Sequence, residues 1–332
     1  MTTTTMSHKQ RLRAALDGQA VDHAPAALWG HDFKREWSAV DLAAFTIESY
    51  DTYGWDLIKL NPRATYYFEA WGSVYQPTGS TQPRLQHHPL NSAEELANLP
   101  EIEATAGVFA EQLEGLDRVV AQVGHEVDVI QTVFNPLTVA SGLLGMRPPA
   151  FLELTRRRPA LVHKGLATIA RVLARYAAAC REAGAGGVFF ATVDWGTSDA
   201  ADAAFYREYG RPYDLQVLAA VHEAPLNVLH VCRDHNLLDL LLDYPVAAFN
   251  WDDHGAGNAS LAAAQQKTPR AVIGGIDRAT LRDGTPGAIA AQARQALTET
   301  GSRRVVLAAG CSVDPSAPAA NLRAVAEAAR GG

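Results

Sequence analysis

The chain has 332 residues, 48% of them hydrophobic, and a formal net charge of −7 at pH 7. This length allows one large domain or two small ones. The acidic balance, interrupted only by the short basic run Arg156-Arg157-Arg158, argues against a nucleic-acid-binding protein. No apolar run approaches the roughly 20 residues that span a bilayer, and the N-terminus has no hydrophobic signal core. We therefore expect a cytoplasmic protein that contacts neither membranes nor nucleic acids.

Strand and helix patterns alternate along the chain. A short helix over residues 7–16 ends at Gly18, and eight later segments are typical of strands: 24–29, 55–60, 127–134, 187–193, 226–232, 246–251, 271–276 and 305–309. The most regular helix pattern runs from Val162 to about Gly184. Other helices are expected at 40–53, 92–99, 107–123, 137–144, 149–155, 215–222, 237–242, 260–266, 286–298 and 318–330. The aromatic segment 66–75, interrupted by Gly72, indicates a hairpin inserted after the second strand.

Eight strands that alternate with helices predict a parallel sheet closed into a single (β/α)₈ TIM barrel. We expect residues 1–24 to form a short N-terminal helical extension and residues 25–332 to form the barrel domain. An open doubly wound sheet is the alternative α/β fold, but no glycine-rich phosphate motif follows the first strand.

The segment 226–232 ends in a histidine and a thiol two positions apart. Because two residues is the strand period, His230 and Cys232 can project from the same face of a strand end. Cys311 follows another predicted strand in a Gly-Cys turn. Imidazole and two thiolates favour zinc, and three protein ligands leave the fourth tetrahedral position open, as in catalytic zinc sites. The third cysteine, Cys180, lies in a helical pattern typical of the core.

A second interpretation of these residues stays open on spacing alone. A single H-x-C arises by chance, and unligated cysteine is common in protein cores. Structural zinc sites usually show two close ligand pairs, whereas this chain has one pair and a distant single cysteine.

Other polar residues fall at predicted C-terminal strand ends, where barrel enzymes carry their chemistry. Asn250, Asp252 and Asp194 are candidates to orient His230 or the substrate, because a zinc-bound histidine normally donates its other N–H to an oxygen. Four residues are candidates for the substrate pocket: His31, Asn61, Asn135 and Trp195. For the acidic residues, the alternative is a strand-end or helix-cap hydrogen bond.

Several ordered motifs resemble those of the uroporphyrinogen decarboxylase superfamily. They are Gln10-Arg11-Leu12, Val21-Asp22-His23-Ala24-Pro25, His230-Val231-Cys232, Phe249-Asn250-Trp251, Ile273-Gly274-Gly275-Ile276-Asp277, and Gly310-Cys311-Ser312-Val313-Asp314-Pro315 with Pro318 and Asn321. The resemblance spans nearly the whole chain, although residues from about 62 to 185 match only in pattern.

Within the superfamily, H-x-C followed much later by G-C resembles one branch. Its members are zinc-dependent methyltransferases that move a methyl group between a corrinoid protein and a thiol such as coenzyme M. The resemblance implies that His230, Cys232 and Cys311 are the zinc ligands. It also implies that a corrinoid, as methylcobalamin, arrives on a partner protein and that the other substrate is a small thiol. Whether the chain forms a homodimer stays open.

The sequence departs from the superfamily at two places. The decarboxylases hold a substrate with many carboxylates through an arginine-rich loop after the first strand; here the two arginines nearest the strand end are absent from Leu28-Trp29-Gly30-His31-Asp32-Phe33-Lys34-Arg35. Arg233 stands where a glycine usually follows H-x-C. Two alternative functions therefore remain: a metal-free, uroporphyrinogen-decarboxylase-like lyase acting on a carboxylated substrate, and a non-catalytic zinc- or tetrapyrrole-binding homologue.

Overall fold

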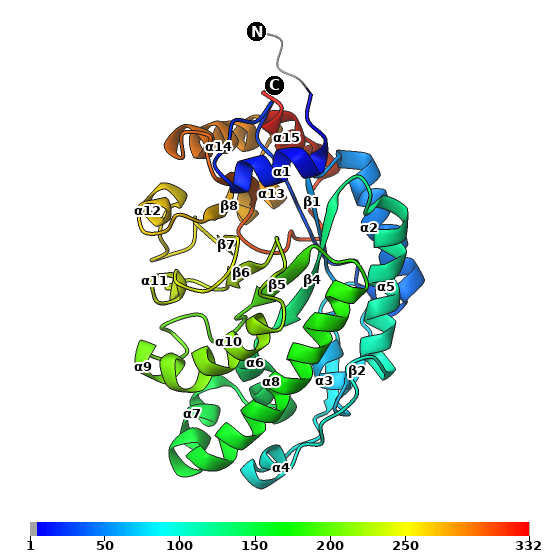
Figure 1. The fold of residues 1–332 in the computed structure, drawn as a ribbon, viewed down its shortest axis with the longest axis vertical. Coiled ribbons are helices and arrows are strands. Elements are labelled where there is room, and N and C mark those ends of the chain that lie inside the picture. The colour runs from blue at the N-terminus through cyan, green and yellow to red at the C-terminus, as the bar shows by residue number, and fades with distance from the viewer. Residues whose placement is uncertain (1–4, 332) are drawn as a thin grey trace.

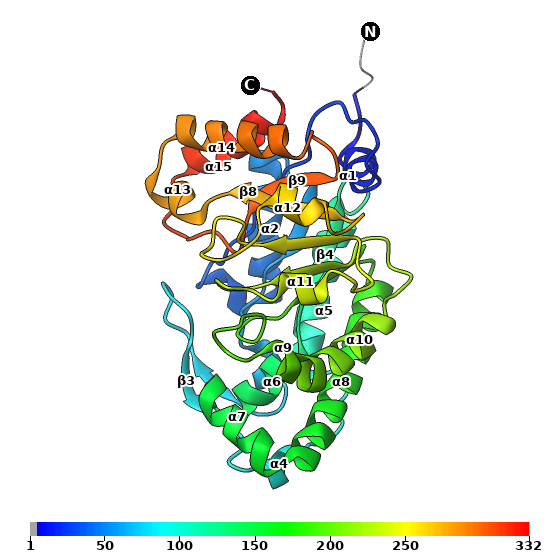
Figure 2. The ribbon, with the colours of Figure 1, turned by 90° about the vertical axis from the view of Figure 1, so that its left-hand side faces the viewer.

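A parallel sheet forms the centre of the protein, for which a computed structural model describes residues 5–331. The sheet has seven strands in the order β1-β4-β5-β6-β7-β8-β9, and it curls so that its two edges approach each other (Figures 1 and 2). Its strands are β1 (Leu57–Leu60), β4 (Asp128–Phe134), β5 (Gly187–Ala191), β6 (Val228–Val231), β7 (Ala248–Trp251), β8 (Ala271–Ile276) and β9 (Val305–Ala309).

The segment 25–27 closes the sheet by bonding to both edge strands. The Ala27 N–H donates to the Leu307 carbonyl, and the Leu307 N–H donates to the Pro25 carbonyl, each at 2.9 Å. On the other side, the Asp56 N–H donates to the Ala26 carbonyl at 2.8 Å. The predicted first strand therefore occupies the eighth position, although it forms only an isolated ladder bridge, Ala26–Leu307. The predicted TIM barrel is confirmed.

Helices surround the barrel, most of them at the predicted positions (Figure 1). On the outside of the curled sheet lie α2 (Ala39–Tyr53), α5 (Gly107–Val123), α6 (Pro136–Leu143), α7 (Pro148–Arg157), α8 (Pro159–Glu182), α10 (Arg211–Ala219), α11 (Leu238–Leu241), α12 (Leu261–Gln265), α14 (Pro286–Glu299) and α15 (Ala319–Ala329). Four short elements were not predicted from the sequence: η1 (Arg35–Trp37), α9 (Ala203–Phe205), the π-helical turn η2 (Tyr206–Gly210) and α13 (Arg278–Asp283).

The inside of the barrel is filled by side chains that alternate along the strands. Because successive residues of a strand face opposite sides, every second residue points inward. The inward residues form one buried cluster that mixes large aromatic rings with small alanines: Ala27, Trp29, Leu57, Ile130, Phe189, Ala191, Leu226, Val228, Ala248, Ala271, Ile273, Val306 and Ala308. The interior is thus a packed core, and a site for a ligand is expected at the C-terminal end of the barrel.

The N-terminal helix α1 (His8–Leu16) packs against β1 and β9 and adds Leu12 to the interior cluster. Ser7 begins the helix with a capping box: its side chain accepts from the Gln10 N–H, and the Gln10 side chain accepts from the Ser7 N–H. Arg11 is buried and donates to Asp22 and Asp56, at 2.7 and 2.6 Å. Since Asp56 also accepts from the Ala26 N–H, one carboxylate links the helix to the strand that closes the barrel.

An insertion follows β1, as predicted, but its hairpin lies later in the chain than expected. Residues 66–69 form the helix α3 (Tyr66–Glu69), whose two tyrosine hydroxyls donate to the Thr132 carbonyl. The hairpin is formed by β2 (Val74–Gln76) and β3 (Arg84–His87) and stands apart from the barrel sheet (Figure 2). The aromatic residues Tyr66 and Tyr67 therefore pack in the core as part of α3. The helix α4 (Ala93–Ala97) follows the hairpin.

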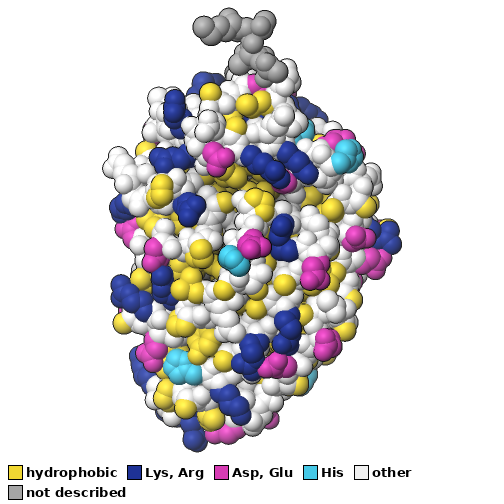
Figure 3. Space-filling view, viewed as in Figure 1, with side chains coloured by type: hydrophobic (Ala, Val, Ile, Leu, Met, Phe, Trp, Pro, Cys, Tyr) yellow, Lys and Arg dark blue, Asp and Glu magenta, His cyan; other side chains and the backbone are white. Residues whose placement is uncertain are grey.

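The surface carries charges of both signs. On the face in Figure 3, the Lys and Arg side chains are interspersed with Asp and Glu and do not gather into one patch. Within residues 5–331, no helix combines the length and apolar character that a membrane span needs.

Leu12 tests the contribution of α1 to the barrel. Its side chain is fully buried in the interior cluster, so Leu12→Ala should leave a cavity and lower the free energy of unfolding by roughly 2–5 kcal/mol. Denaturant unfolding measures this change. Leu85→Ala, on the exposed hairpin, is the control and should change stability little. Equal losses in the two variants would show that α1 does not stabilise the barrel.

Candidate metal centre

Three potential metal ligands meet at the C-terminal end of the barrel. His230 is the third residue of β6 and faces inward, Cys232 follows the same strand, and Cys311 lies just after β9. One donor atom from each of the three lies within 4.8 Å of the others, and the His230 Nε2 atom is 3.2 Å from the Cys232 Sγ. The barrel therefore brings together residues separated by 79 positions, from 232 to 311, into a group that could hold a metal ion.

Asn250 fixes the orientation of the histidine ring. Its Nδ2 donates to the carbonyls of Ile273 and Ala309, at 2.9 and 3.2 Å, so its Oδ1 must be the atom that faces His230. The Oδ1 is 2.6 Å from His230 Nδ1. Because this oxygen can only accept, the Nδ1 atom carries the proton, and the lone pair of Nε2 points toward the two cysteines. This is the tautomer that a metal-binding histidine needs.

Gly310 allows the Gly-Cys turn to reach this position. A Cβ atom at Gly310 would lie 2.3 Å from the Cα of Asp252, far inside van der Waals contact. The close approach of the two loops therefore requires glycine immediately before Cys311.

The two thiols of the site are hydrogen-bonded to each other, which shifts their pKa values in opposite directions. The hydrogen bond from Cys232 holds the pKa of Cys311 well below its usual range, and the nearby His230 acts in the same direction. The same hydrogen bond, together with burial, raises the pKa of Cys232. The pair therefore titrates as a unit that favours one thiolate.

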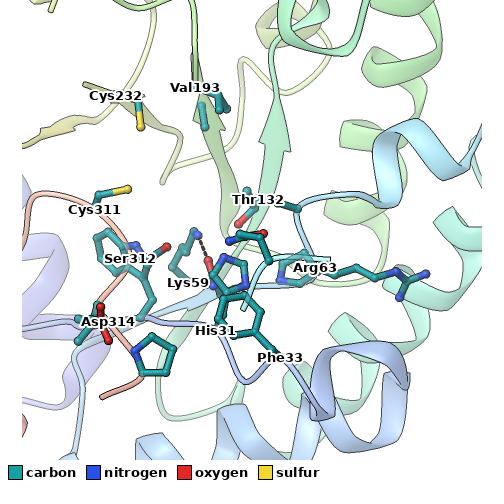
Figure 4. A pocket seen from close by; sticks show the side chains of 18 of the residues that line it. His31, Phe33, Lys59, Arg63, Thr132, Val193, Cys232, Cys311, Ser312 and Asp314 are labelled. Atoms are coloured by element: carbon teal, nitrogen blue, oxygen red, sulfur yellow. Dashed lines mark hydrogen bonds between the residues drawn. The ribbon is translucent and has the colours of Figure 1, made fainter. Parts of the chain in front are cut away.

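A cavity of about 810 Å³ lies beside the three donors (Figure 4). Much of its wall is aromatic, formed by Trp29, Phe33, Tyr67, Phe134 and Phe189, and its polar groups include His31, Lys59, Asn61, Arg63 and Arg278. In Figure 4 the sulfur atoms of Cys232 and Cys311 turn toward the same space, whereas Arg63 extends away from it. His230, Cys232 and Cys311 therefore lie at one side of a largely apolar cavity whose wall carries few charged side chains.

The structure places two of the four predicted pocket residues on the cavity wall. His31 stacks on Phe33 and has its Nδ1 2.6 Å from the buried carboxylate of Glu36. Asn61 lies at the end of β1 and accepts a hydrogen bond from Lys59.

The other two predicted pocket residues do not line this cavity. Asn135 is fully buried, where it caps α6 through the Thr138 N–H and contacts Tyr206. Trp195 is also fully buried, and its indole N–H donates to Ser141.

Two predicted acidic residues also lie outside the cavity wall. Asp194 pairs with Arg233 at the surface, and Asp252 accepts from the His254 N–H in its own loop. Burial raises the pKa of Asp252, which lies against Gly310. Of the three predicted orienting residues, Asn250 is therefore the one that contacts His230.

Lys59 and Arg278 line the cavity but were not predicted to belong to the site. Lys59 stands in the middle of an apolar strand, and the strand period puts it on the inner face with Leu57; a charge at such a position was the available signal. Arg278 begins α13, and its side chain donates to the Ser312 carbonyl at the cavity edge. No sequence pattern predicted that contact.

Arg233 adopts the backbone conformation that favours glycine, with a φ of 78°. Glycine, which the resemblance leads one to expect after H-x-C, would adopt this conformation without strain. The Arg233 side chain compensates by pairing with Asp194 in the neighbouring loop.

The comparisons with known proteins agree with this fold. The sequence profile of the family described as uroporphyrinogen decarboxylase (URO-D) matches residues 7–332, so the chain belongs to that family. No curated protein matches the sequence significantly.

Three solved structures have similar folds. A methyltransferase from Methanosarcina mazei has a TM-score of 0.85 at 22% identity, with 98% of each chain covered. A B12-independent methionine synthase from Shewanella sp. W3-18-1, in complex with selenomethionine, has a TM-score of 0.58 at 12% identity, with 93% of each chain covered. A putative vitamin-B12 independent methionine synthase from Listeria monocytogenes has a TM-score of 0.53 at 13% identity, covering 95% of this chain and 97% of its own. At these identities the likeness shows the shared fold.

Asn250→Leu should weaken divalent-metal binding by roughly tenfold to hundredfold, because the ring of His230 loses the acceptor that fixes its tautomer. Competition with a chromophoric chelator measures the affinity. Asn321→Leu is a matched control, since Asn321 is also buried and donates to two carbonyls. Its acceptors, the carbonyls of Leu281 and Gly284, do not contact His230, Cys232 or Cys311. Equal affinities for the two variants would contradict the role of Asn250.

Arg233→Gly should be more stable than Arg233→Ala by roughly 1–2 kcal/mol, the reverse of the usual order. Both changes remove the ion pair with Asp194, but only glycine relieves the positive φ. Thermal unfolding of the two variants measures the difference. A more stable alanine variant would show that the loop relaxes out of this conformation.

Proposed function

We propose that the protein is a zinc-dependent methyltransferase that moves a methyl group between a corrinoid, carried by a partner protein, and a small thiol. The observation that carries the proposal is the convergence of His230, Cys232 and Cys311 beside a cavity, with the histidine held in the tautomer that binds a metal. The cysteines must stay reduced, and a reducing compartment such as the cytoplasm would keep them so.

The donor set favours zinc over other common ions. One imidazole and two thiolates are soft ligands, and their donor atoms lie close enough together to share one ion. Three protein ligands leave room for a substrate atom as the fourth. When bound, zinc would supply a Lewis acid that holds the substrate thiol as a thiolate at neutral pH.

The chain's own residues would orient and protect the reactants. The thiol R–SH loses its proton to solvent, the sulfur forms a bond to the methyl carbon, and the bond from that carbon to its donor breaks with the electron pair left on the donor. The aromatic walls from Trp29 and Phe189 keep water away from the sulfur, which preserves its nucleophilicity. The reverse transfer uses the same groups.

The known structures with this fold support the choice. The neighbour from Methanosarcina mazei is described as a methyltransferase, and two others are described as methionine synthases. Methionine is itself a methyl thioether, so the theme of methyl transfer to sulfur recurs on this fold.

A metal-free decarboxylase-like lyase is less well supported. A substrate with many carboxylates needs many cations, whereas the cationic side chains on the cavity wall are Lys59, Arg63 and Arg278. Arg63 is already paired with Glu69 and Glu111. Arg35, in the loop after the first strand, pairs with Glu48 instead of lining the cavity.

Elemental analysis of the purified protein tests the metal. We expect about one zinc per chain in the wild type, and loss of both zinc and methyl transfer from methylcobalamin to thiols in Cys311→Ser, because one of three donors is removed. Cys180→Ala is the matched control: Cys180 is buried in α8, away from the site, and the variant should keep both properties. Full activity in metal-free protein would overturn the proposal.

X-ray absorption at the zinc edge distinguishes an enzyme from an inert zinc-binding homologue. Adding a substrate thiol should increase the number of sulfur neighbours of the zinc by one, because the fourth position is open to substrate. An unchanged zinc environment at saturating thiol would instead support a non-catalytic zinc site.

A further inference from the structure

Lys59 is a charged side chain buried inside the barrel. It is the third residue of β1, so its side chain points inward like that of Leu57, and the residue is only 6% exposed. Burial lowers the pKa of Lys59 to about 7, although the nearby thiols of Cys311 and Cys232 act in the opposite direction. Keeping an ammonium group in this position costs the folded state free energy.

The protein satisfies only part of the hydrogen-bonding capacity of this ammonium group. Its Nζ donates to the Oδ1 of Asn61 and lies 4.7 Å from the ring centre of Phe189 and 5.8 Å from that of Trp29. Among the residues that the structure describes, no carboxylate forms an ion pair with Lys59. An ammonium group has three N–H donors, so two remain for a ligand.

Asn61 adds further unused donors at the same place. Its Oδ1 is occupied by Lys59, and its Nδ2, although buried, has no hydrogen-bond partner in the protein. Both residues line the cavity, and Figure 4 shows the Lys59 side chain there. Buried polar groups without partners are rare in native structures, so a cluster of them at a cavity wall points to a ligand that supplies acceptors.

Phe189 lies between this donor cluster and His230, and its contacts with both set an upper limit on the distance that separates them. Its ring stacks on the His230 ring with centres 5.1 Å apart, and the Lys59 Nζ lies 4.7 Å from the same ring centre, so Nζ is at most about 9.8 Å from the centre of His230. A molecule that spans the two groups must therefore be short.

We propose that Lys59 and Asn61 bind an anionic oxygen group of the substrate, a carboxylate or a sulfonate, so that the thiol acceptor is a short thiol acid. This inference rests on the proposed function, because the thiol end would lie at His230, Cys232 and Cys311. Arg278 is less suited to the role: it is exposed to solvent and already donates to the Ser312 carbonyl.

A purely structural role for Lys59 fits the contacts poorly. A structural buried lysine is normally paired with a carboxylate, and an apolar side chain of similar size would pack against Trp29 and Phe189 without the desolvation cost. The retained ammonium group is accounted for when a ligand completes its hydrogen bonds.

Calorimetric titration of the zinc-loaded protein tests the proposal with three thiols of equal length. The probes are 3-mercaptopropionate, 2-mercaptoethanesulfonate and the uncharged 3-mercaptopropanol, in which the same number of bonds separates the thiol sulfur from the head-group oxygen. The wild type should bind at least one of the acids roughly tenfold to hundredfold more tightly than the alcohol, because a charge-assisted hydrogen bond forms. The tighter of the two acids identifies the head group. Equal binding of the acids and the alcohol would overturn the proposal.

Lys59→Met separates the subsite from general effects of mutation. The variant should bind the alcohol as the wild type does and should lose the preference for the acid, and its melting temperature should not fall, since a buried charge is removed. Lys164→Met is the matched control, because Lys164 also donates to an asparagine Oδ1, that of Asn98, but at the surface. A preference that survives Lys59→Met would exclude the assignment.

A further titration distinguishes failure of the subsite from failure of the metal proposal. Propionate and ethanesulfonate, which lack a thiol group, are titrated into His230→Ala and into His230→Ala/Lys59→Met. Binding that is present in the first and absent in the second supports the anion subsite whatever metal the protein holds. The same weak binding in both variants would contradict the subsite alone.

Discussion

The carboxamide of Asn250 holds together the part of the structure on which the site depends. It belongs to β7, and its oxygen faces the His230 ring on β6. Its nitrogen donates to the carbonyls of Ile273, within β8, and of Ala309, at the end of β9. One buried side chain thus spans four consecutive strands. Because the two acceptors leave no freedom to flip the amide, the proton of the imidazole stays on Nδ1. The position of Cys311 relative to His230 follows from the same contacts, since Cys311 lies two residues after Ala309.

The barrel interior beneath the Asn250 amide is apolar, so the polar groups of the site lie next to a hydrophobic core. The interior combines small residues such as Ala248 and Ala308 with the large rings of Trp29 and Phe189, which meet edge to face at 5.2 Å. The rings form a floor between the packed core and the polar rim. Charges above such a floor interact through a medium of lower dielectric constant than water. A thiolate and an ammonium group near this floor therefore influence each other more strongly than they would at the surface.

The barrel and the grouping of three potential metal ligands could be predicted from the sequence, because both rest on local patterns. Strand periodicity sets which residues share a face, and the fold carries strand ends to one rim, so His230, Cys232 and Cys311 could be grouped before any coordinates. The same logic could not decide what each strand-end residue does. Asn135 caps a helix and Trp195 packs in the core, since a loop of a few residues can turn a side chain either way. The hairpin at 66–75 was wrong because helix α3 packs its tyrosines inward.

Lys59 shows what a search limited to strand ends leaves out. It lies inside a strand, where an apolar residue is expected, and local propensity gives no reason for a charge there. The charge balance of the proposed site gives a reason for a positive charge at this position. A zinc ion with two thiolates is neutral overall, and a bound substrate thiolate makes the cluster negative by one charge. A carboxylate or sulfonate on the same molecule would add a second negative charge within a partly apolar chamber, at a high desolvation cost. The ammonium group of Lys59 offsets that charge where it is bound. Lys59 thus lowers the stability of the protein without substrate, and it strengthens binding when an anionic thiol occupies the cavity.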